Sequence, residues 1–414
     1  MTIKPFKAVR PKPELVSKVA ALPYDVMNTE EARVMAAGNP YSFLRVDKSE
    51  IDLPPETDPY SDEVYAKAGE NLRELIKSAM TQDAQQNFYV YRLTGYGQTQ
   101  TGLAACVSVS EYELGLIKKH ELTRADKELD RINHMVACEA HTGPIFLAYR
   151  SEDSSEAKKI LREIVNEKPV YDFTAEDGVQ HELWIVGCVE TQDTLIRAFE
   201  KIPALYIADG HHRNATAAKV AKMRNASTVA SGSLDLDAEH NYYLAVIFPH
   251  DELAILDYNR VVKDLNGMEQ SAFLEKLESN WNIEKSSAPV KPARKFEIGM
   301  YLSNQWYRLA LKNLPDSADT INSLDCSVLQ NTVLSPILGI NDLRSDKRID
   351  FVGGIRGLAE LEKRVNSGEM EVAFALFPTS MNELMSVADA KQIMPPKSTW
   401  FEPKLRSGML VHEF

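Results

Sequence analysis

The fold of this chain is decided within residues 205–219, LYIADGHHRNATAAK. The first four of these residues favour a short buried strand, and Asp209-Gly210 supplies a turn in which glycine tolerates a positive φ. From Asn214 onward, alanine-rich sequence predicts a helix that runs to about Arg224. The segment therefore predicts a strand, a tight turn and a helix in direct succession.

The start of this helix is suited to an anion. A helix leaves its first amide groups unpaired and carries the positive end of its dipole there, so it stabilises a phosphate. Arg213 can bind phosphate oxygens through two parallel hydrogen bonds, and His211 and His212 can donate to them or move protons. We interpret the segment as a phosphate-binding catalytic turn, in which Asp209 and His211 are catalytic candidates. The predicted phosphate contacts are Gly210, His211, His212, Arg213 and Asn214.

This turn has two other interpretations, a simple helix cap and a zinc site. Asp209 could merely cap the helix, with both histidines at the surface. A zinc ion would need both imidazoles, yet adjacent residues at a helix start diverge by about 100°. His134, Cys138 and His141 also lack the His-Glu-x-x-His order of metallohydrolases, which favours packing or capping roles. We therefore expect no bound zinc or iron.

Composition narrows the class of protein. The 414 residues suffice for two to three domains, and 44% hydrophobic with 26% charged residues is ordinary for a globular chain. A net charge of −13 argues against wide nucleic-acid binding, which needs clustered Lys and Arg. The four cysteines are dispersed, no signal-peptide region follows Met1, and no apolar run approaches the roughly 20 residues of a membrane span. We expect reduced thiols, a cytoplasmic location and no membrane insertion.

Periodicity along the chain predicts an α/β (α+β mixed) protein. We expect a catalytic core at 1–250 and a C-terminal αβ domain at 251–414, whose tail at 394–408 can return to the active site. Helices are predicted near 30–35, 60–80, 132–140, 155–166, 326–334 and 381–390. Strands are predicted near 41–46, 88–93, 100–109, 143–149, 242–248, 296–302, 306–311 and 372–377.

Two further segments carry functional groups. Asp25 follows a strand-like segment in which Pro23 holds the preceding residue extended, so it is a plausible loop carboxylate. Residues 118–131 form a dense charged run, which is either a solvated face or one wall of a polar cleft. In the second case, His120 and Thr123 would contact the substrate and Glu121 would be catalytic.

The tail MPPKSTWFEPK, residues 394–404, is extended by its prolines and presents two lysines and two hydroxyls together. Lys397 and Lys404 could close over an anionic ligand, with Ser398 and Thr399 contacting the substrate. The same tail could equally be a structural edge strand.

Five motifs in one order carry a resemblance to a known family. They are residues 22–26 (LPYDV), 39–46 (NPYSFLRV), 119–123 (KHELT), 209–213 (DGHHR) and 394–399 (MPPKST). Together they resemble the bacterial and archaeal family called domain of unknown function 1015 over almost the whole chain. The Asp-Gly-His-His-Arg turn is further similar to the phosphate-binding turn of ParB/sulfiredoxin-like free serine kinases.

This second resemblance implies a ParB/sulfiredoxin-like core with large insertions. It also implies phosphorylation of free L-serine by pyrophosphate or ADP, with Mg²⁺ bound to the donor. Asp209, His211, His212 and Arg213 would then hold the donor phosphates, and Asp25 or Glu121 would be the base. The kinases use a glutamate early in the chain, whereas this sequence has Asp25 there, with Glu30 and Glu31 nearby.

Pyrophosphate or ADP is expected to serve better than ATP, because the chain has no Gly-x-x-x-x-Gly-Lys-Ser/Thr loop and no kinase-type Gly-x-Gly-x-x-Gly. Two alternatives remain open. A phosphohydrolase on the same turn would let water reach the phosphorus. A ParB-like nucleotide-responsive regulator would need a basic helix-turn-helix, and none is visible.

Overall fold

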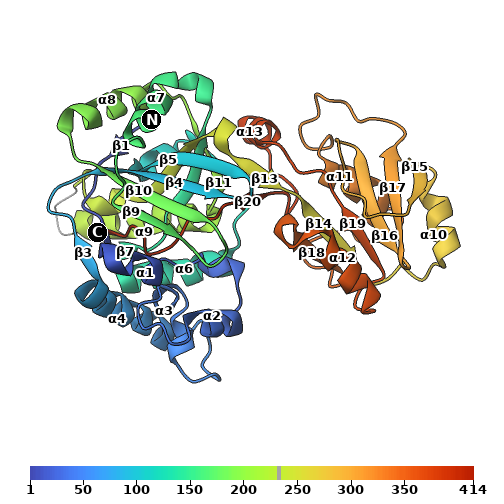
Figure 1. Cartoon of the computed structure of the whole chain (residues 1–414), viewed down its shortest axis with the longest axis horizontal. Helices are drawn as coiled ribbons and strands as arrows, with labels where there is room; N and C mark the ends of the chain where they lie inside the picture. Colours follow the sequence, from blue (N-terminus) through green and yellow to red (C-terminus); the bar gives the residue numbers. More distant parts are fainter. Residues whose placement is uncertain (231–234) are drawn as a thin grey trace. The chain divides into compact units, whose positions relative to one another are not determined.

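The computed structural model describes residues 1–230 and 235–414. Two compact units make up the chain (Figure 1): unit 1 is Met1–Leu253 together with Pro403–Phe414, and unit 2 is Ala254–Glu402. Both units combine helices and strands, so the protein is a mixed α/β protein, as predicted. Unit 2 is thus inserted between two parts of the chain that fold together.

Unit 1 is built on a nine-stranded sheet of order β6-β11-β8-β12-β5-β4-β10-β9, with β1 beside β5. Only the β6–β11 and β8–β12 pairs are parallel. The predicted hairpin at 88–109 is present as β4 and β5. The strands are β1 (Ile3–Lys4), β4 (Phe88–Gly95), β5 (Gln98–Ser108), β6 (Ile117–Lys118), β8 (Ile145–Tyr149), β9 (Tyr171–Thr174), β10 (Gln180–Val186), β11 (Leu205–Asp209) and β12 (Tyr242–Pro249).

Alternate residues of these strands point to one face and form the main core of unit 1. Leu103, Leu147 and Ile247 lie there in one cluster with side chains from three helices, α7 (Ser155–Ile164), α8 (Val189–Glu200) and α9 (His211–Ala230). Helix α6 (Ala125–Cys138) packs between α9 and α4 (Asp62–Ala79). Burial of this face fixes the position of α9 against the sheet.

A second, helical core lies at the N-terminal part of unit 1 (Figure 1, blue). It contains α1 (Val16–Val19), α2 (Thr29–Ala36), α3 (Leu44–Asp47) and α4. The predicted start of α2 is confirmed, because the Asn28 side chain accepts from the Glu31 amide and the Glu31 side chain accepts from the Asn28 amide.

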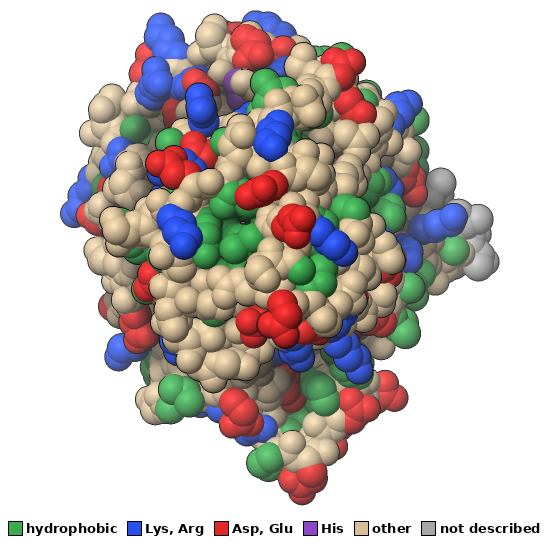
Figure 2. Space-filling view, turned by 90° about the vertical axis from the view of Figure 1, so that its right-hand side faces the viewer, with side chains coloured by type: hydrophobic (Ala, Val, Ile, Leu, Met, Phe, Trp, Pro, Cys, Tyr) green, Lys and Arg blue, Asp and Glu red, His purple; other side chains and the backbone are tan. Residues whose placement is uncertain are grey.

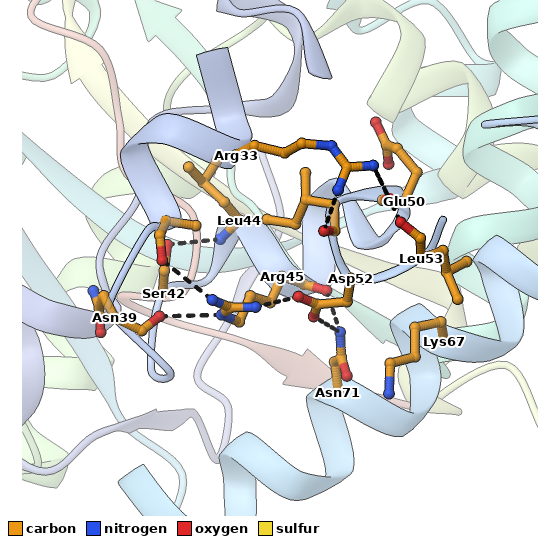
Figure 3. A network of polar contacts seen from close by, with 12 residues as sticks. Arg33, Asn39, Ser42, Leu44, Arg45, Glu50, Asp52, Leu53, Lys67 and Asn71 are labelled. Carbon is orange, nitrogen blue, oxygen red and sulfur yellow. Dashed lines mark hydrogen bonds and ion pairs between the residues drawn. The ribbon is translucent and has the colours of Figure 1, made fainter. Parts of the chain in front are cut away.

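The predicted strand at 41–46 is wrong, since this segment is a turn followed by α3. A polar network around Arg45 explains the difference (Figure 3). The Arg45 guanidinium donates to the carbonyls of Asn39 (3.1 Å) and Ala36 (3.2 Å) and pairs with Asp52. Asn71 on α4 donates to the Arg45 carbonyl at 2.7 Å and to Asp52 at 2.9 Å. These tertiary contacts override the β propensity of the segment.

The last twelve residues, Pro403–Phe414, run through unit 1. Ser407 exchanges backbone hydrogen bonds with Ala21 at 3.2 and 2.9 Å, and Val411 does so with Val9 at 2.9 and 2.8 Å. The tail ends in β21 (His412–Glu413), which pairs with β7 (Ala140–His141). Leu410 and Val411 are fully buried. The tail is therefore part of the core of unit 1.

Unit 2 has a six-stranded antiparallel sheet of order β15-β17-β16-β19-β14-β18. The predicted strands at 296–302, 306–311 and 372–377 are β16, β17 and β19, whereas the periodicity gave no sign of helix α12. The elements are β13 (Ala254–Leu256), β14 (Tyr258–Val262), α10 (Gln270–Leu277), β15 (Trp281–Ser286), β16 (Glu297–Leu302), β17 (Gln305–Leu311), α11 (Asp325–Leu329), β18 (Ile349–Gly353), α12 (Gly357–Asn366), β19 (Val372–Ala375), α13 (Met381–Asp389) and β20 (Trp400–Glu402).

Charge is mixed on the face of the molecule seen in Figure 2, where Lys and Arg side chains lie among Asp and Glu side chains around a small apolar hollow. Nothing in this view resembles the continuous basic surface of a nucleic-acid interface. None of the helices in the described residues is long and apolar enough to cross a bilayer.

Candidate functional site

The predicted strand, turn and helix are present as β11, Gly210 and α9. Gly210 has a φ of +92°, which a residue with a side chain rarely adopts, and its amide donates to the Asp209 carboxylate at 2.8 Å. The helix begins at His211, three residues earlier than the sequence predicted, and continues to Ala230. His211, His212 and Arg213 therefore form its first turn, where the amides have no carbonyl within the helix to bond.

Asp209 is paired with a lysine from the end of the chain. Lys404 Nζ donates to Asp209 Oδ2 at 2.8 Å, and the lysine side chain is largely buried. Burial alone would raise the pKa of Asp209, but the charges of Lys404 and Arg213 outweigh it and hold that pKa well below its usual range. Asp209 is thus a fixed carboxylate, and Lys404 places a cation at the turn.

Arg213 runs between two glycines. A Cβ at Gly210 would come within 3.4 Å of Arg213 Nε, and a Cβ at Gly143 would come within 3.1 Å of Nη1. The guanidinium donates from Nη1 to the Pro144 carbonyl at 2.6 Å, while its buried Nε has no acceptor among the described residues. Arg213 is therefore half-buried and held by the protein on one side.

His211 is buried behind the turn rather than presented on it. Its Nε2 accepts from the His120 amide at 3.4 Å, so a neutral His211 carries its proton on Nδ1, which lies 3.9 Å from Glu121 Oε2. Burial, reinforced by the neighbouring His120, lowers the pKa of His211 well below its usual value. His211 is therefore a neutral ring that orients towards Glu121, and its predicted phosphate contact and catalytic role stay predictions.

His120 lies still deeper. Its ring meets the His211 ring edge-on with 4.4 Å between centroids, and its side chain is fully buried. Burial lowers the pKa of His120 to about 4, partly opposed by the charge of Asp209. The predicted substrate contact of His120 stays a prediction.

His212 is half-buried, and burial lowers its pKa, while the charges of Glu128 and Asp25 oppose that change. Thr123 donates its hydroxyl to Glu128, which also pairs with Lys219. Asp25 is exposed in the short helical turn Tyr24–Val26, and the side chain of Glu121 is 46% exposed. Both predicted bases are therefore open to solvent, and the choice between them stays a prediction.

The side chain of Asn214 is fully buried and donates from Nδ2 to the Tyr243 hydroxyl at 3.2 Å, and its amide donates to the Gly210 carbonyl. The predicted phosphate contact of Asn214 stays a prediction. Lys397, Ser398 and Thr399 belong to unit 2, and their predicted roles stay predictions.

A cavity of about 30 Å³ adjoins Arg213, large enough for one or two water molecules. Sequence reasoning missed three of its lining residues, Tyr24, Arg131 and Ser407. The Arg131 guanidinium lies over the Tyr24 ring at 4.0 Å from its centroid. Arg131 belongs to the charged run at 118–131, which was interpreted as one possible wall of a polar cleft. No residue close to Ser407 in sequence points to the site.

No group of three or more His, Cys, Asp or Glu side chains in the described part of the chain is arranged to hold a metal ion. A divalent cation at this turn would have to take most of its oxygen ligands from a phosphorylated molecule, as Mg²⁺ commonly does.

The buried histidines predict a steep loss of stability in acid. A histidine whose folded pKa is lowered binds its proton more readily in the unfolded chain, so stability is complete above about pH 6.5 and falls as the pH drops. His120 alone, with a pKa of about 4, would remove roughly 3 kcal/mol between pH 6.5 and 4. Urea unfolding between pH 7 and 4.5 measures this. His120→Leu should flatten the curve, and an unchanged slope in that variant would contradict the assignment.

Comparisons with known proteins agree with the sequence resemblance. A search of solved structures found distant likenesses: a free serine kinase in complex with AMP (12% identity, 72% of this chain and 86% of that chain, TM-score 0.34) and SbnI with a C-terminal truncation from Staphylococcus aureus (12%, 74% and 86%, 0.37). A conserved hypothetical protein from Pyrococcus furiosus is similar at 13% identity, 75% and 95% coverage and TM-score 0.34. A search of curated proteins found no match. Residues 3–327 match the family described as "Protein of unknown function (DUF1015)", and the chain therefore belongs to that family.

Proposed function

We propose that unit 1 is a ParB/sulfiredoxin-like phosphotransferase core that moves a phosphoryl group from pyrophosphate or ADP to the hydroxyl of free L-serine. The observation that carries this proposal is the first turn of α9. Its first-turn amides, Arg213 and Lys404 form one corner of positive charge. Asp25 is an exposed carboxylate whose charge acts on His212 of the same turn. The similarity of the turn's sequence to that of free serine kinases supports the choice of substrate.

The donor phosphates would bind the first-turn amides and the Nε side of Arg213, the part of the guanidinium for which residues 1–230 and 235–414 offer no acceptor. Lys404 is shared between Asp209 and the donor. Asp209 does not serve as a base, because a carboxylate held by two cations has little affinity for a proton. Its role is to hold Lys404 and the Gly210 amide in place.

In the proposed step, the serine hydroxyl oxygen attacks the terminal phosphorus of the donor. A new O–P bond forms as the bond to the leaving phosphate breaks, and the hydroxyl proton passes to Asp25. Positioning and charge stabilisation supply most of the acceleration in phosphoryl transfer, so the fixed cations at the turn do the main work. Mg²⁺ would accompany the donor and neutralise the leaving phosphate.

A phosphohydrolase is the second candidate, and the small cavity beside Arg213 favours it. A polar cavity that admits one or two waters next to a phosphate-binding arginine could supply the attacking water. The P–O bond of the donor would then break with water in place of serine, and no phosphoserine would form.

The test is formation of O-phosphoserine from L-serine with each donor in turn. We expect product with pyrophosphate or ADP in the presence of Mg²⁺, and loss of product in Asp25→Asn, which keeps the shape of the side chain but cannot accept the proton. Glu30→Gln, a change to a solvated residue on α2, is the matched control. Product with ATP alone would contradict the donor assignment. Release of phosphate without phosphoserine would move the function to the phosphohydrolase.

A further inference from the structure

Arg260 in unit 2 is a buried cation whose hydrogen bonds are incomplete. It lies in β14, between β18 and β19, and only 1% of its surface is exposed. Its Nη1 donates to the Tyr258 carbonyl, which holds the guanidinium in place. Its Nε and Nη2 are buried and have no acceptor among the described residues. Buried donors of this kind are rare, because each costs the energy of its lost hydration.

The charge of Arg260 also lacks a carboxylate partner in the described part of the chain, and its guanidinium lies over the Phe351 ring, 5.4 Å from the ring centroid. The groups whose charge reaches it are the thiol of Cys326 and the phenol of Tyr258. Burial lowers the pKa of Arg260, yet an arginine keeps its proton at any physiological pH. A buried charge without a counter-charge is strongly destabilising. Something that the protein itself does not supply would relieve this cost.

The two unpaired nitrogens identify the missing partner by their geometry. Nε and Nη2 form one edge of the planar guanidinium, and their N–H bonds point in parallel. This edge matches the two oxygens of a carboxylate or phosphate, which it binds through two parallel hydrogen bonds. We propose that unit 2 binds an oxyanion on the Nε/Nη2 edge of Arg260, as a site separate in its residues from the turn of unit 1.

The surroundings supply further groups for such a ligand. Lys397 places Nζ 5.8 Å from the centroid of the Tyr258 ring, and the same ring meets Trp400 edge-on at 5.2 Å. Ser398 lies 3.2 Å from Cys326 through its hydroxyl. Residues 397–400 therefore pack on the two groups that flank Arg260. Lys397 thus brings a second positive charge against the ring of Tyr258, the residue whose carbonyl holds Arg260. The Ser398 hydroxyl already donates to the Pro395 carbonyl at 2.6 Å.

Both unpaired nitrogens are buried, so an oxyanion reaches them only if the side chains that cover them shift. Lys397 holds a φ of +59°, a left-handed conformation that is uncommon for a residue with a side chain. An oxyanion that reached Arg260 would exchange these covering contacts for two charge-assisted hydrogen bonds. Phosphate and carboxylate share this chemistry, so the choice between them is made by experiment.

The experiment is thermal unfolding of the full chain in sodium phosphate, in sodium acetate and in sodium chloride of equal ionic strength. Three of the four tryptophans, Trp281, Trp306 and Trp400, lie in unit 2, so tryptophan fluorescence reports mainly on that unit. We expect phosphate or acetate to raise the Tm by roughly 5 °C over chloride at saturation. The anion that produces the rise identifies the ligand class.

Two variants separate this site from the turn of unit 1. Arg213→Ala should keep the anion-dependent rise seen by fluorescence, whereas Arg260→Met should lose it. Arg260→Met should also be at least as stable as the parent without the anion, because a methionine of similar length removes an unpaired buried charge. If Arg260 served only to stabilise the fold, Arg260→Met would be less stable than the parent in chloride. The proposal is overturned if neither anion raises the Tm, if Arg260→Met keeps the rise, or if that variant is less stable than the parent in chloride.

Discussion

Arg213→Ala is expected to lower kcat/KM for phosphoryl transfer by about 10²- to 10³-fold, the usual loss when a fixed donor to developing charge is removed. It should also lower the free energy of unfolding by about 1–3 kcal/mol, because the Pro144 carbonyl loses its donor and Asp209 loses one of its two cations. Donor-dependent turnover and urea unfolding, measured on the same preparation, test both parts.

Two controls make this result specific. Arg213→Lys keeps a charge near Asp209 but cannot bind two oxygens side by side. It should therefore retain a larger share of the parent's free energy of unfolding than of its kcat/KM. Arg224→Ala removes another arginine from α9, whose partner Glu139 is exposed, and should leave turnover unchanged. If Arg213→Ala turned over at the parent rate, the proposal that this turn binds phosphate would be contradicted.

Deletion of Pro403–Phe414 is expected to abolish cooperative unfolding of unit 1. The deletion removes four buried apolar side chains, those of Leu405, Met409, Leu410 and Val411. Each contributes roughly 1.5–3 kcal/mol by burial, so together they approach the roughly 5–15 kcal/mol that stabilises an ordinary domain. Circular dichroism during heating, with the full chain alongside, measures the loss.

Lys404→Met separates the chemical role of the tail from its structural one. This variant keeps the buried side chains and the backbone pairing with Val9 and Ala21, so it should unfold cooperatively. It should bind pyrophosphate about 10-fold or more weakly, since one charged hydrogen bond is lost. A folded, soluble deletion variant that binds pyrophosphate as the full chain does would contradict both expectations.

Local sequence predicted the centre of the site well, because a strand, a glycine turn and an alanine-rich helix follow each other without help from distant residues. The limit was the start of α9: the first-turn residues His211 and His212 gave no helical signal of their own. The same local reasoning failed at 41–46, where Arg45 is bound by carbonyls and by Asp52 in a network that no propensity describes.

The partners of the turn were harder to predict. Lys404 lies 195 residues from Asp209 in sequence, and only its positive charge and its place in an extended tail pointed to an anion site. The burial of His120 and His211 could not be predicted either. Both histidines have polar neighbours in sequence, which indicates exposure, and their burial follows only from the packing of the surrounding elements. Arg260 stands in the buried strand β14, and a sequence cannot show whether a carboxylate from another strand lies beside it.

The route of the tail through unit 1 has a consequence for biosynthesis. A chain emerges from the ribosome from its N-terminus, so unit 2 is synthesised before the segment that completes unit 1. Until residues 403–414 emerge, Asp209 has no Lys404 and Val9 has no strand partner. We expect the turn at 209–213 to be complete only after residues 403–414 have emerged, so a shorter nascent chain would carry the residues of the turn without the Lys404 pairing that holds Asp209.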